Sequence, residues 1–225
     1  MSRFSDRLTD PRPLLFDGGF GTQLFARGVE LPNSALANQS HGDAVVDVHR
    51  AYLAAGSDCI ETNTFVASSL HLEMAEASEA DSAQLARLAS EHARRAADEV
   101  DREVYIAGAL GPSPGAIEAD AGDTEFGIAD VKVRDAHERI ATALAESGVD
   151  FFLVETMFSA REAAIAVDVD KMPKSMAALQ ALFIANKDDP AAALEAMQSR
   201  VTQQKSKRVS ALGGALTRSR SGGET

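Results

Sequence analysis

The stretch GVDFFLVET, residues 148–156, decides the fold class of this 225-residue chain. An almost unbroken apolar run follows its glycine, and the stretch ends on Glu155 and Thr156. Such a run indicates a strand buried on both faces, which is typical of a parallel sheet. Helical spacing over residues 135–147 precedes the strand and ends at Gly148, since glycine commonly terminates a helix. The stretch therefore predicts a helix followed by a buried parallel strand.

Three other apolar, strand-like runs precede this one along the chain. They are PLLFDGG (13–19), SDCIETNTF (57–65) and VYIAGALGP (104–112). Helical spacing of apolar residues fills much of the intervals, over 43–56 and 82–100. This alternation of strand and helix predicts right-handed parallel βαβ units. Two α/β architectures remain open at this point, a doubly wound sheet and a (β/α)8 barrel.

Polar or turn-forming residues follow each of the four predicted strands. In both candidate architectures, functional groups gather at the carboxyl ends of the parallel strands. Because these positions recur at the same end of each strand, we expect a ligand site there. The residues at these ends are Asp17, then Glu61, Thr62 and Asn63, then Gly111 and Pro112, then Glu155 and Thr156.

Composition excludes several classes of partner. The net charge of −12 argues against nucleic acid as the main partner. No apolar run approaches the length of a membrane span, and the first 13 residues lack the apolar core of a secretory signal. The single cysteine excludes an internal disulfide and suits a reducing compartment. We therefore expect a cytoplasmic protein with no nucleic-acid or membrane partner.

The composition changes near residue 168. Residues 1–170 hold 30 Asp+Glu and 13 Lys+Arg, whereas residues 171–225 hold 4 and 9. We expect one α/β unit over 1–167, two tail helices of unrelated composition over 168–204, and a disordered, basic Ser/Gly-rich end over 205–225. The apolar stripe of the expected tail helices is Met176, Leu179, Leu182, Phe183, Leu194, Met197 and Val201.

The glycine-rich turn in LLFDGGFGTQLF, residues 14–25, has more than one interpretation. A glycine turn after a strand suggests a phosphate cradle, but G-x-G-x-x-G and a P-loop lysine are absent. The turn alternatively allows the backbone to close around a small ligand while Asp17 points into a site. A third interpretation is a tight strand-to-helix turn in which the aspartate is only a cap.

Four motifs in order resemble the homocysteine S-methyltransferase family, in particular its methionine synthase-like homocysteine-binding domain. They are LLFDGGFGTQL, AGSDCIETNTF, IAGALGPSPG and GVDFFLVETMFSAREA. The resemblance covers roughly residues 12–167. The family fold is a (β/α)8 barrel, so the resemblance implies its N-terminal half only. We therefore expect a truncated (β/α)8 TIM barrel of about four βα units, followed by a helical tail.

The resemblance also implies a ligand and its binding residues. By this resemblance, the carboxylates of Asp17 and Glu155 are expected to bind the amino group of homocysteine. The turn Gly18-Gly19-Phe20-Gly21 would bring backbone N–H groups to the carboxylate of the same amino acid. The remaining predicted substrate-binding residues are Glu61, Thr62 and Asn63, for which a hydrogen-bonded turn is the alternative interpretation. The implied function is methyl transfer to the homocysteine sulfur, giving methionine, and no catalytic residue is assigned.

The resemblance implies zinc, which converts the homocysteine thiol into a thiolate. The family holds this zinc by three cysteines in Gly-x-Asn-Cys and Gly-Gly-Cys-Cys-Gly segments, and neither segment is present. Cys59 lies within a predicted strand, where a buried small apolar residue is the expected role. The histidines are expected to be surface or packing residues: His41, His49, His71, His92 and His137.

Two functional hypotheses follow, and the first of them needs zinc to activate the thiol. Because the zinc ligands are missing, we expect this chain to bind no metal. The first is a homocysteine S-methyltransferase-like protein whose methyl donor is S-methylmethionine, betaine or a folate or cobalamin carrier. The second is a catalytically inactive fragment or an amino-acid-binding pseudoenzyme. The number of cysteines distinguishes the two hypotheses. The first needs three cysteine thiolates to hold the zinc, and the sequence contains one cysteine.

Four strands cannot close a barrel, so the outer strands are expected to have open edges. With spatial order 1-2-3-4, these are PLLFDG (13–18) and FFLVET (151–156), which lack edge charges and prolines within their apolar runs. The tail helices could cover the open side. The alternative is a homodimer or other self-association through these edges.

Overall fold

The computed structural model describes residues 3–118, 127–167 and 178–179. Contacts divide the chain into Met1–Phe183 and Ile184–Thr225, and the second unit lies outside the described residues. No helix in the described ranges combines the length and apolar character that a membrane span requires. The elements in chain order are α1 (Arg3–Arg7), α2 (Phe20–Phe25), η1 (Ser34–Leu36), α3 (Ala37–Ser40), α4 (Gly42–Ala54), β1 (Cys59–Glu61), α5 (Ser69–Met74), α6 (Ser82–Ala97), β2 (Tyr105–Leu110), α8 (Asp130–Glu146), β3 (Phe151–Val154), α9 (Ala160–Val167) and β4 (Ala178–Leu179).

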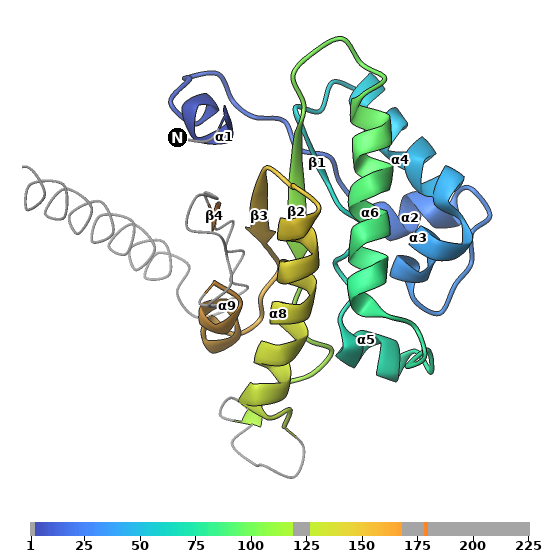
Figure 1. Cartoon of the computed structure of the whole chain (residues 1–225), viewed down its shortest axis with the longest axis vertical. Helices are drawn as coiled ribbons and strands as arrows, with labels where there is room; N and C mark the ends of the chain where they lie inside the picture. Colours follow the sequence, from blue (N-terminus) through green and yellow to red (C-terminus); the bar gives the residue numbers. More distant parts are fainter. Residues whose placement is uncertain (1–2, 119–126, 168–177, 180–225) are drawn as a thin grey trace, which may run out of the picture. The chain divides into compact units, whose positions relative to one another are not determined.

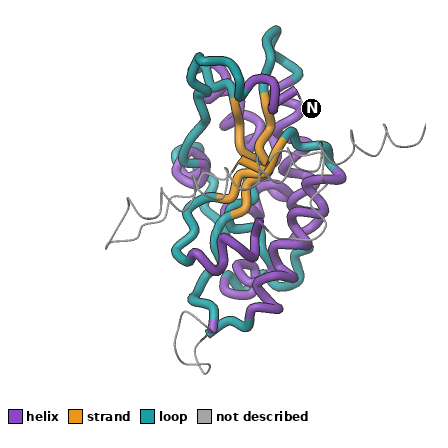
Figure 2. The backbone as a smooth tube through the Cα atoms, turned by 90° about the vertical axis from the view of Figure 1, so that its left-hand side faces the viewer, coloured by secondary structure: helices purple, strands orange, loops and turns teal. Residues whose placement is uncertain are grey.

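The strands form a parallel sheet in the order β1-β2-β3-β4. Ile60 pairs with Ile106 across β1 and β2, and Ala107 pairs with Phe151 across β2 and β3. Helices α4, α6 and α8 pack side by side along the sheet (Figure 1). Figure 2 shows the strands running together through the centre of the view. The prediction of an α/β fold with a parallel sheet is confirmed.

The first predicted strand is shorter than expected. Over 13–19 the only ladder pairing with another described residue is an isolated parallel bridge between Phe16 and Cys59. Two backbone bonds flank it, from the Cys59 N–H to the Leu15 carbonyl at 3.0 Å and from the Asp17 N–H to the Cys59 carbonyl at 3.1 Å. Pro13 has no N–H to donate, and a glycine turn follows Asp17 at once, so few residues remain for a ladder.

Strand β4 corrects the expectation of a helix at two positions. Ala178 and Leu179 pair in parallel with Phe152 and Leu153 of β3, although a helix was expected there and no strand after residue 170. The physical reason is that the edge of β3 presents backbone groups that a passing segment can pair. The edge at FFLVET is therefore not fully open. The remaining tail residues lie outside the described ranges, and self-association stays a prediction.

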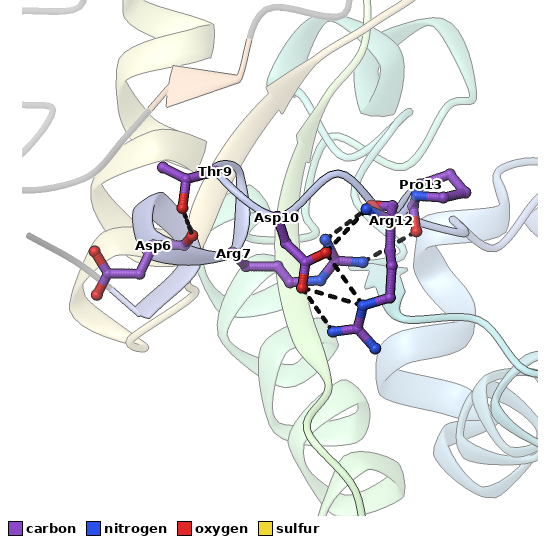
Figure 3. Close-up of polar contacts among 6 residues, drawn as sticks. All are labelled: Asp6, Arg7, Thr9, Asp10, Arg12 and Pro13. Atoms are coloured by element: carbon purple, nitrogen blue, oxygen red, sulfur yellow. Dashed lines mark hydrogen bonds and ion pairs between the residues drawn. The ribbon is translucent and has the colours of Figure 1, made fainter.

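Helix α1 brings an aromatic side chain onto the sheet. Phe4 is fully buried, and its ring stacks on Phe151 with centroids 3.8 Å apart. The turn after α1 is held by Arg7, whose guanidinium donates to the Arg12 carbonyl at 2.9 Å and to the Pro13 carbonyl at 3.0 Å (Figure 3). The sequence interpretation assigned no element to this segment, because five residues are too few for a periodic pattern.

Alternating side chains of the strands enter two apolar clusters. Ile60, Ile106 and Phe152 belong to a large cluster shared with the helices. Cys59, Tyr105 and Phe151 belong to a second cluster that includes Phe4. Both faces of the sheet are therefore buried over these residues, as the apolar runs predicted. The buried position of Cys59 in β1 also confirms its expected packing role.

A repeated Gly-x-Asp pattern fixes the entry of two strands. Gly56 and Gly148 end α4 and α8 with φ of +103° and +74°, a region that favours glycine. Two residues later, Asp58 accepts a hydrogen bond from the Leu15 N–H at 3.0 Å, and Asp150 accepts one from the Ile106 N–H at 2.8 Å. Each aspartate thus ties the start of its strand to the neighbouring segment, which aligns the opposite ends where the predicted site residues lie.

Candidate functional site

A cavity of about 400 Å³ lies at the carboxyl ends of the strands. All seven predicted substrate-binding residues line this one cavity, although they come from three separate segments of the sequence. The lining residues are Asp17, Gly18, Gly19, Phe20, Gly21, Ser34, Glu61, Thr62, Asn63, Phe65, Ala109, Glu155 and Thr156.

Asp17 joins the first segment of the site to the second. Its Oδ2 accepts a hydrogen bond from the Glu61 N–H at 2.9 Å, while its Oδ1 is buried without a hydrogen-bond partner among the described residues. Burial, followed by the negative charge of Glu155, raises the pKa of Asp17 to about 7 despite the hydrogen bond from Glu61. The free oxygen and the raised pKa are both consistent with a carboxyl group that lacks a cationic partner.

The glycine turn does not use left-handed backbone. Neither Gly18 nor Gly19 has a positive φ. A Cβ on Gly18 would lie 3.4 Å from the Tyr52 hydroxyl, an ordinary contact, whereas one on Gly19 would lie 3.0 Å from Thr22 Oγ1, which is tight. The same Tyr52 hydroxyl donates to the Gly19 carbonyl at 3.1 Å, which fastens the turn to α4. Close packing therefore restricts Gly19, while Gly18 leaves the backbone beside the cavity without a side chain.

Glu155 enters the site from the end of β3. Its N–H donates to the Leu110 carbonyl at 3.1 Å, so the sheet ladder fixes its backbone. Thr156 follows with φ of +56°, an unusual conformation for a β-branched residue that costs about 1–3 kcal/mol. Backbone strain of this kind concentrates at functional sites. The strained residue is part of the cavity wall.

Thr62 and Asn63 line the cavity, but their side chains are engaged inside the protein. Thr62 Oγ1 accepts from the Ala109 N–H at 3.1 Å and contacts Thr64 Oγ1 at 2.8 Å. Asn63 Nδ2 donates to the Ser34 carbonyl at 2.9 Å and to Asn38 Oδ1 at 3.0 Å. These bonds agree with the hydrogen-bonded turn that the sequence interpretation left open. The two residues shape the wall through their backbone and buried side chains.

The sequence interpretation did not select six of the lining residues as ligand-binding. Phe20 and Gly21 belong to the same turn as Gly18 and Gly19, and Thr156 follows Glu155 at a strand end, so their positions were a usable signal. The other three carried none, because they reach the cavity from a loop, from the first residue of a short helix, or from a small residue of β2: Phe65, Ser34 and Ala109.

A second cavity of about 590 Å³ adjoins the first. Phe65 and Thr156 line both cavities. The loop after β2 forms much of its wall, so Pro112, expected at the site, lies in this second cavity. Phe158 also lines it with 74% of its surface exposed. The carboxyl ends of the strands therefore border two adjoining cavities.

A comparison with known families shows to which family the chain belongs. The model described as Homocysteine S-methyltransferase matches residues 14–213, which is most of the chain. The chain belongs to the homocysteine S-methyltransferase family. The match continues past Val167, where the resemblance was expected to end, but apart from residues 178–179 that later part lies outside the described ranges.

Individual relatives agree with the family. Methionine synthase of Mycobacterium tuberculosis (strain ATCC 25618 / H37Rv) is 36% identical over 160 residues, which is 64% of this chain and 12% of that protein. Methionine synthase of Mycobacterium leprae (strain TN) is 35% identical with the same coverage. The chain thus spans only 12% of the length of these curated relatives.

Solved structures give the same fold. The metallated form of the homocysteine methyltransferase MmuM from Escherichia coli is 25% identical with a TM-score of 0.59, over 72% of this chain and 60% of that one. Its oxidized form has a TM-score of 0.63 at 24% identity, over 77% and 63% of the two chains, and supports the fold alone.

The residues described do not fit a three-thiolate zinc site. Cys59 is the single cysteine of the sequence and is buried in β1. Burial, with the nearby charge of Asp58, raises the pKa of the Cys59 thiol to about 12, which opposes thiolate formation. Within the described ranges, no group of three or more His, Cys, Asp or Glu residues is arranged to hold a metal. No step is therefore assigned to zinc.

A buried glutamate connects the second cavity to the surrounding helices. Glu162 is 3% exposed, and its Oε1 accepts from the Ser113 N–H at 2.6 Å and from His137 Nε2 at 3.2 Å. Burial alone would raise the pKa of Glu162, but the bonds from His137 and Ser113 lower it below the ordinary value. Glu162 thus ties α9 to α8 and to the loop after β2, and His137 is the packing residue expected from the sequence.

Replacing Glu162 with glutamine is expected to lower the free energy of unfolding by about 1–3 kcal/mol near pH 7, because charge-assisted hydrogen bonds are lost. Since the folded-state pKa is depressed, the wild-type contribution is present above the ordinary glutamate value of 4.5 and is lost as pH falls through the folded pKa. Urea unfolding at neutral and acidic pH measures both effects. If Glu162→Gln lowers the free energy of unfolding by the same amount at both pH values, Glu162 is not the charged group assigned here.

Proposed function

We propose that this chain binds homocysteine in the carboxylate-lined cavity of about 400 Å³, and that its described residues provide the homocysteine-recognition part of a methyl transfer to the homocysteine sulfur. One observation carries the proposal: all seven residues predicted from the family motifs line the same cavity. The choice of homocysteine as the ligand follows from the family to which the chain belongs. The methyl transfer is the activity named for the family and for the MmuM relative.

In this proposal, Asp17 and Glu155 bind the ammonium group of the amino acid. A half-buried cavity strengthens a charge-assisted hydrogen bond relative to water, and Asp17 Oδ1 has no partner among the described residues. Backbone N–H groups of Gly18 and Gly19 would bind the ligand carboxylate, since both residues are exposed at the cavity and carry no side chain. The two ends of the amino acid would thereby fix its orientation.

Activation of the sulfur is the part of the reaction that these residues do not account for. Zinc, where the family binds it, supplies a thiolate nucleophile in place of the thiol. Cys59 is buried and has a raised pKa, so it does not act as a substitute ligand here. What the described residues contribute is recognition: they bind and orient the amino acid.

A second candidate follows from the same cysteine observation. A chain with one buried cysteine can bind the amino acid and lack turnover, which makes it an amino-acid-binding pseudoenzyme. We further propose that the described βα units form part of a (β/α)8 barrel, as in the family. The parallel order of the strands and the TM-scores of the MmuM structures support this arrangement.

Calorimetry, elemental analysis and a turnover assay together separate the candidates. We expect saturable homocysteine binding, no stoichiometric zinc, and no methionine above a buffer control with S-methylmethionine, betaine or a methylated folate carrier. One zinc per chain, together with turnover that is lost in Asp17→Asn, would restore the enzymatic candidate. Absence of homocysteine binding would reject both.

A further inference from the structure

The cavity brings together three carboxyl groups and no basic side chain. Asp17, Glu61 and Glu155 all line it, and no lysine, arginine or histidine is among its described lining residues. Like charges in a half-buried space cannot all remain ionised without compensation. The charge must be balanced by protons or by a bound cation.

Glu61 lies close to another carboxyl group of the cavity. Asp17 Oδ2 accepts a hydrogen bond from the Glu61 N–H at 2.9 Å, and Glu155 lines the same cavity. The negative charges of Glu155 and Asp17 both act on the Glu61 side chain. A proton on Glu61 would relieve this repulsion and would provide a donor, which a set of ionised carboxylates lacks.

Among the described residues, the charges that act on Asp17 and Glu61 are those of carboxylates, while Arg27 acts on Tyr52 and Arg7 on Cys59. Tyr52 of α4 interacts electrostatically with Asp17 and Glu61, and burial and the charge of Asp17 raise its pKa, which keeps it neutral. Cys59 of β1 is likewise neutral, since burial, then the charges of Asp58 and Asp17, raise its pKa. Burial, then Glu155, then Asp17 raise the pKa of Glu61 to about 9. Together these groups favour a protonated Glu61 in the empty cavity.

We propose that Glu61 is a specificity-determining carboxyl: it carries a proton in the empty cavity and releases it when a ligand ammonium group binds. The proposal rests on the proposed function and deepens it. In the exchange, the O–H bond of Glu61 breaks, its electron pair stays on the carboxylate, and the proton passes to solvent. The ammonium ion then hydrogen-bonds to the carboxylates. Glu61 thereby selects amino acids with a cationic amino group and rejects N-acylated analogues.

Calorimetry in two buffers of different ionisation enthalpy counts the released protons. Homocysteine is the probe, and the measurement is made at about pH 8, where Asp17 has mostly lost its own proton. We expect release approaching one proton for each ligand bound by the wild type. In Glu61→Gln, which retains a donor toward Glu155, we expect release close to zero. Binding without release in the wild type, or equal release in both proteins, would overturn the proposal.

A titration of the unliganded protein tests the proton separately. Carboxyl-carbon NMR, with the Glu61 signal assigned by its loss in Glu61→Gln, is expected to show protonation persisting at neutral pH. Titration of Glu61 near the ordinary value of 4.5 would overturn the proposal. Glu146→Gln, an exposed residue at the end of α8, is the matched control and should change neither result. If homocysteine fails to bind while Glu61 titrates high, the proposed function fails and the proton assignment stands.

Discussion

Replacing Glu155 with glutamine is expected to weaken homocysteine binding by roughly 10- to 100-fold. The substitution keeps the size and the backbone of the residue, which is fixed by its N–H bond to the Leu110 carbonyl, but removes the negative charge. Hydrogen bonds between charged groups contribute about 1.5–3 kcal/mol, which gives this range. Asp17→Asn should weaken binding to a similar extent. Calorimetric titration of each variant measures the change in dissociation constant.

A matched control separates loss of the ligand contact from general damage. Glu146→Gln removes one glutamate charge from α8, at a position 62% exposed in its side chain and outside the cavity lining. Its dissociation constant should equal that of the wild type. Unchanged binding in both Glu155→Gln and Asp17→Asn would show that neither carboxylate holds the ammonium group.

Alanine at Gly111 is expected to lower the free energy of unfolding by about 3 kcal/mol or more, at or above the upper end of the roughly 1–3 kcal/mol typical of overpacked sites. The new Cβ would lie 2.4 Å from the Phe65 carbonyl oxygen and 2.7 Å from Phe65 Cδ2. A backbone carbonyl cannot rotate away as a side chain can, so the two segments must separate. Because Phe65 lines both cavities, homocysteine binding should weaken together with stability.

Gly115→Ala is the control for this prediction. It lies in the same loop, and its added Cβ would meet Ile128 Cδ1 at 3.4 Å, an ordinary contact distance. Its unfolding free energy should change by less than about 1 kcal/mol. Urea unfolding of both variants measures the difference. If the two substitutions cost the same, close packing of Gly111 against Phe65 is not what requires the glycine.

The sheet was predictable because its strands are short, apolar and punctuated by polar ends. The run FFLV predicted β3, and the glycines before β1 and β3 marked the ends of the preceding helices. The strand predicted around Phe16 was too long, since Pro13 and the glycine turn leave this segment a single bridge. Strand β4 was missed because its two residues pair with β3 through backbone groups, which no side-chain pattern reveals.

The position of the site was predictable for a related reason. Parallel strands place their carboxyl ends together, so Asp17, Glu61 and Glu155 meet in one cavity although they are far apart in sequence. The bonding of individual side chains was not predictable. The contact between His137 and Glu162 depends on how α8 and α9 pack, and the inward bonds of Asn63 depend on the placement of η1 and α3. The spacing of residues in the sequence predicts neither the His137–Glu162 contact nor the bonds of Asn63.

The most direct test of homocysteine recognition is residue-resolved NMR of the chain during titration with homocysteine. If the ligand occupies the carboxylate-lined cavity, the amide signals of Gly18, Gly19 and Glu61 should shift with one common dissociation constant. Signals of Ser113 and Ile117, which line only the second cavity, should shift less. An absence of shifts at Gly18, Gly19 and Glu61 at saturating homocysteine, or shifts confined to Ser113 and Ile117, would contradict the proposed binding site.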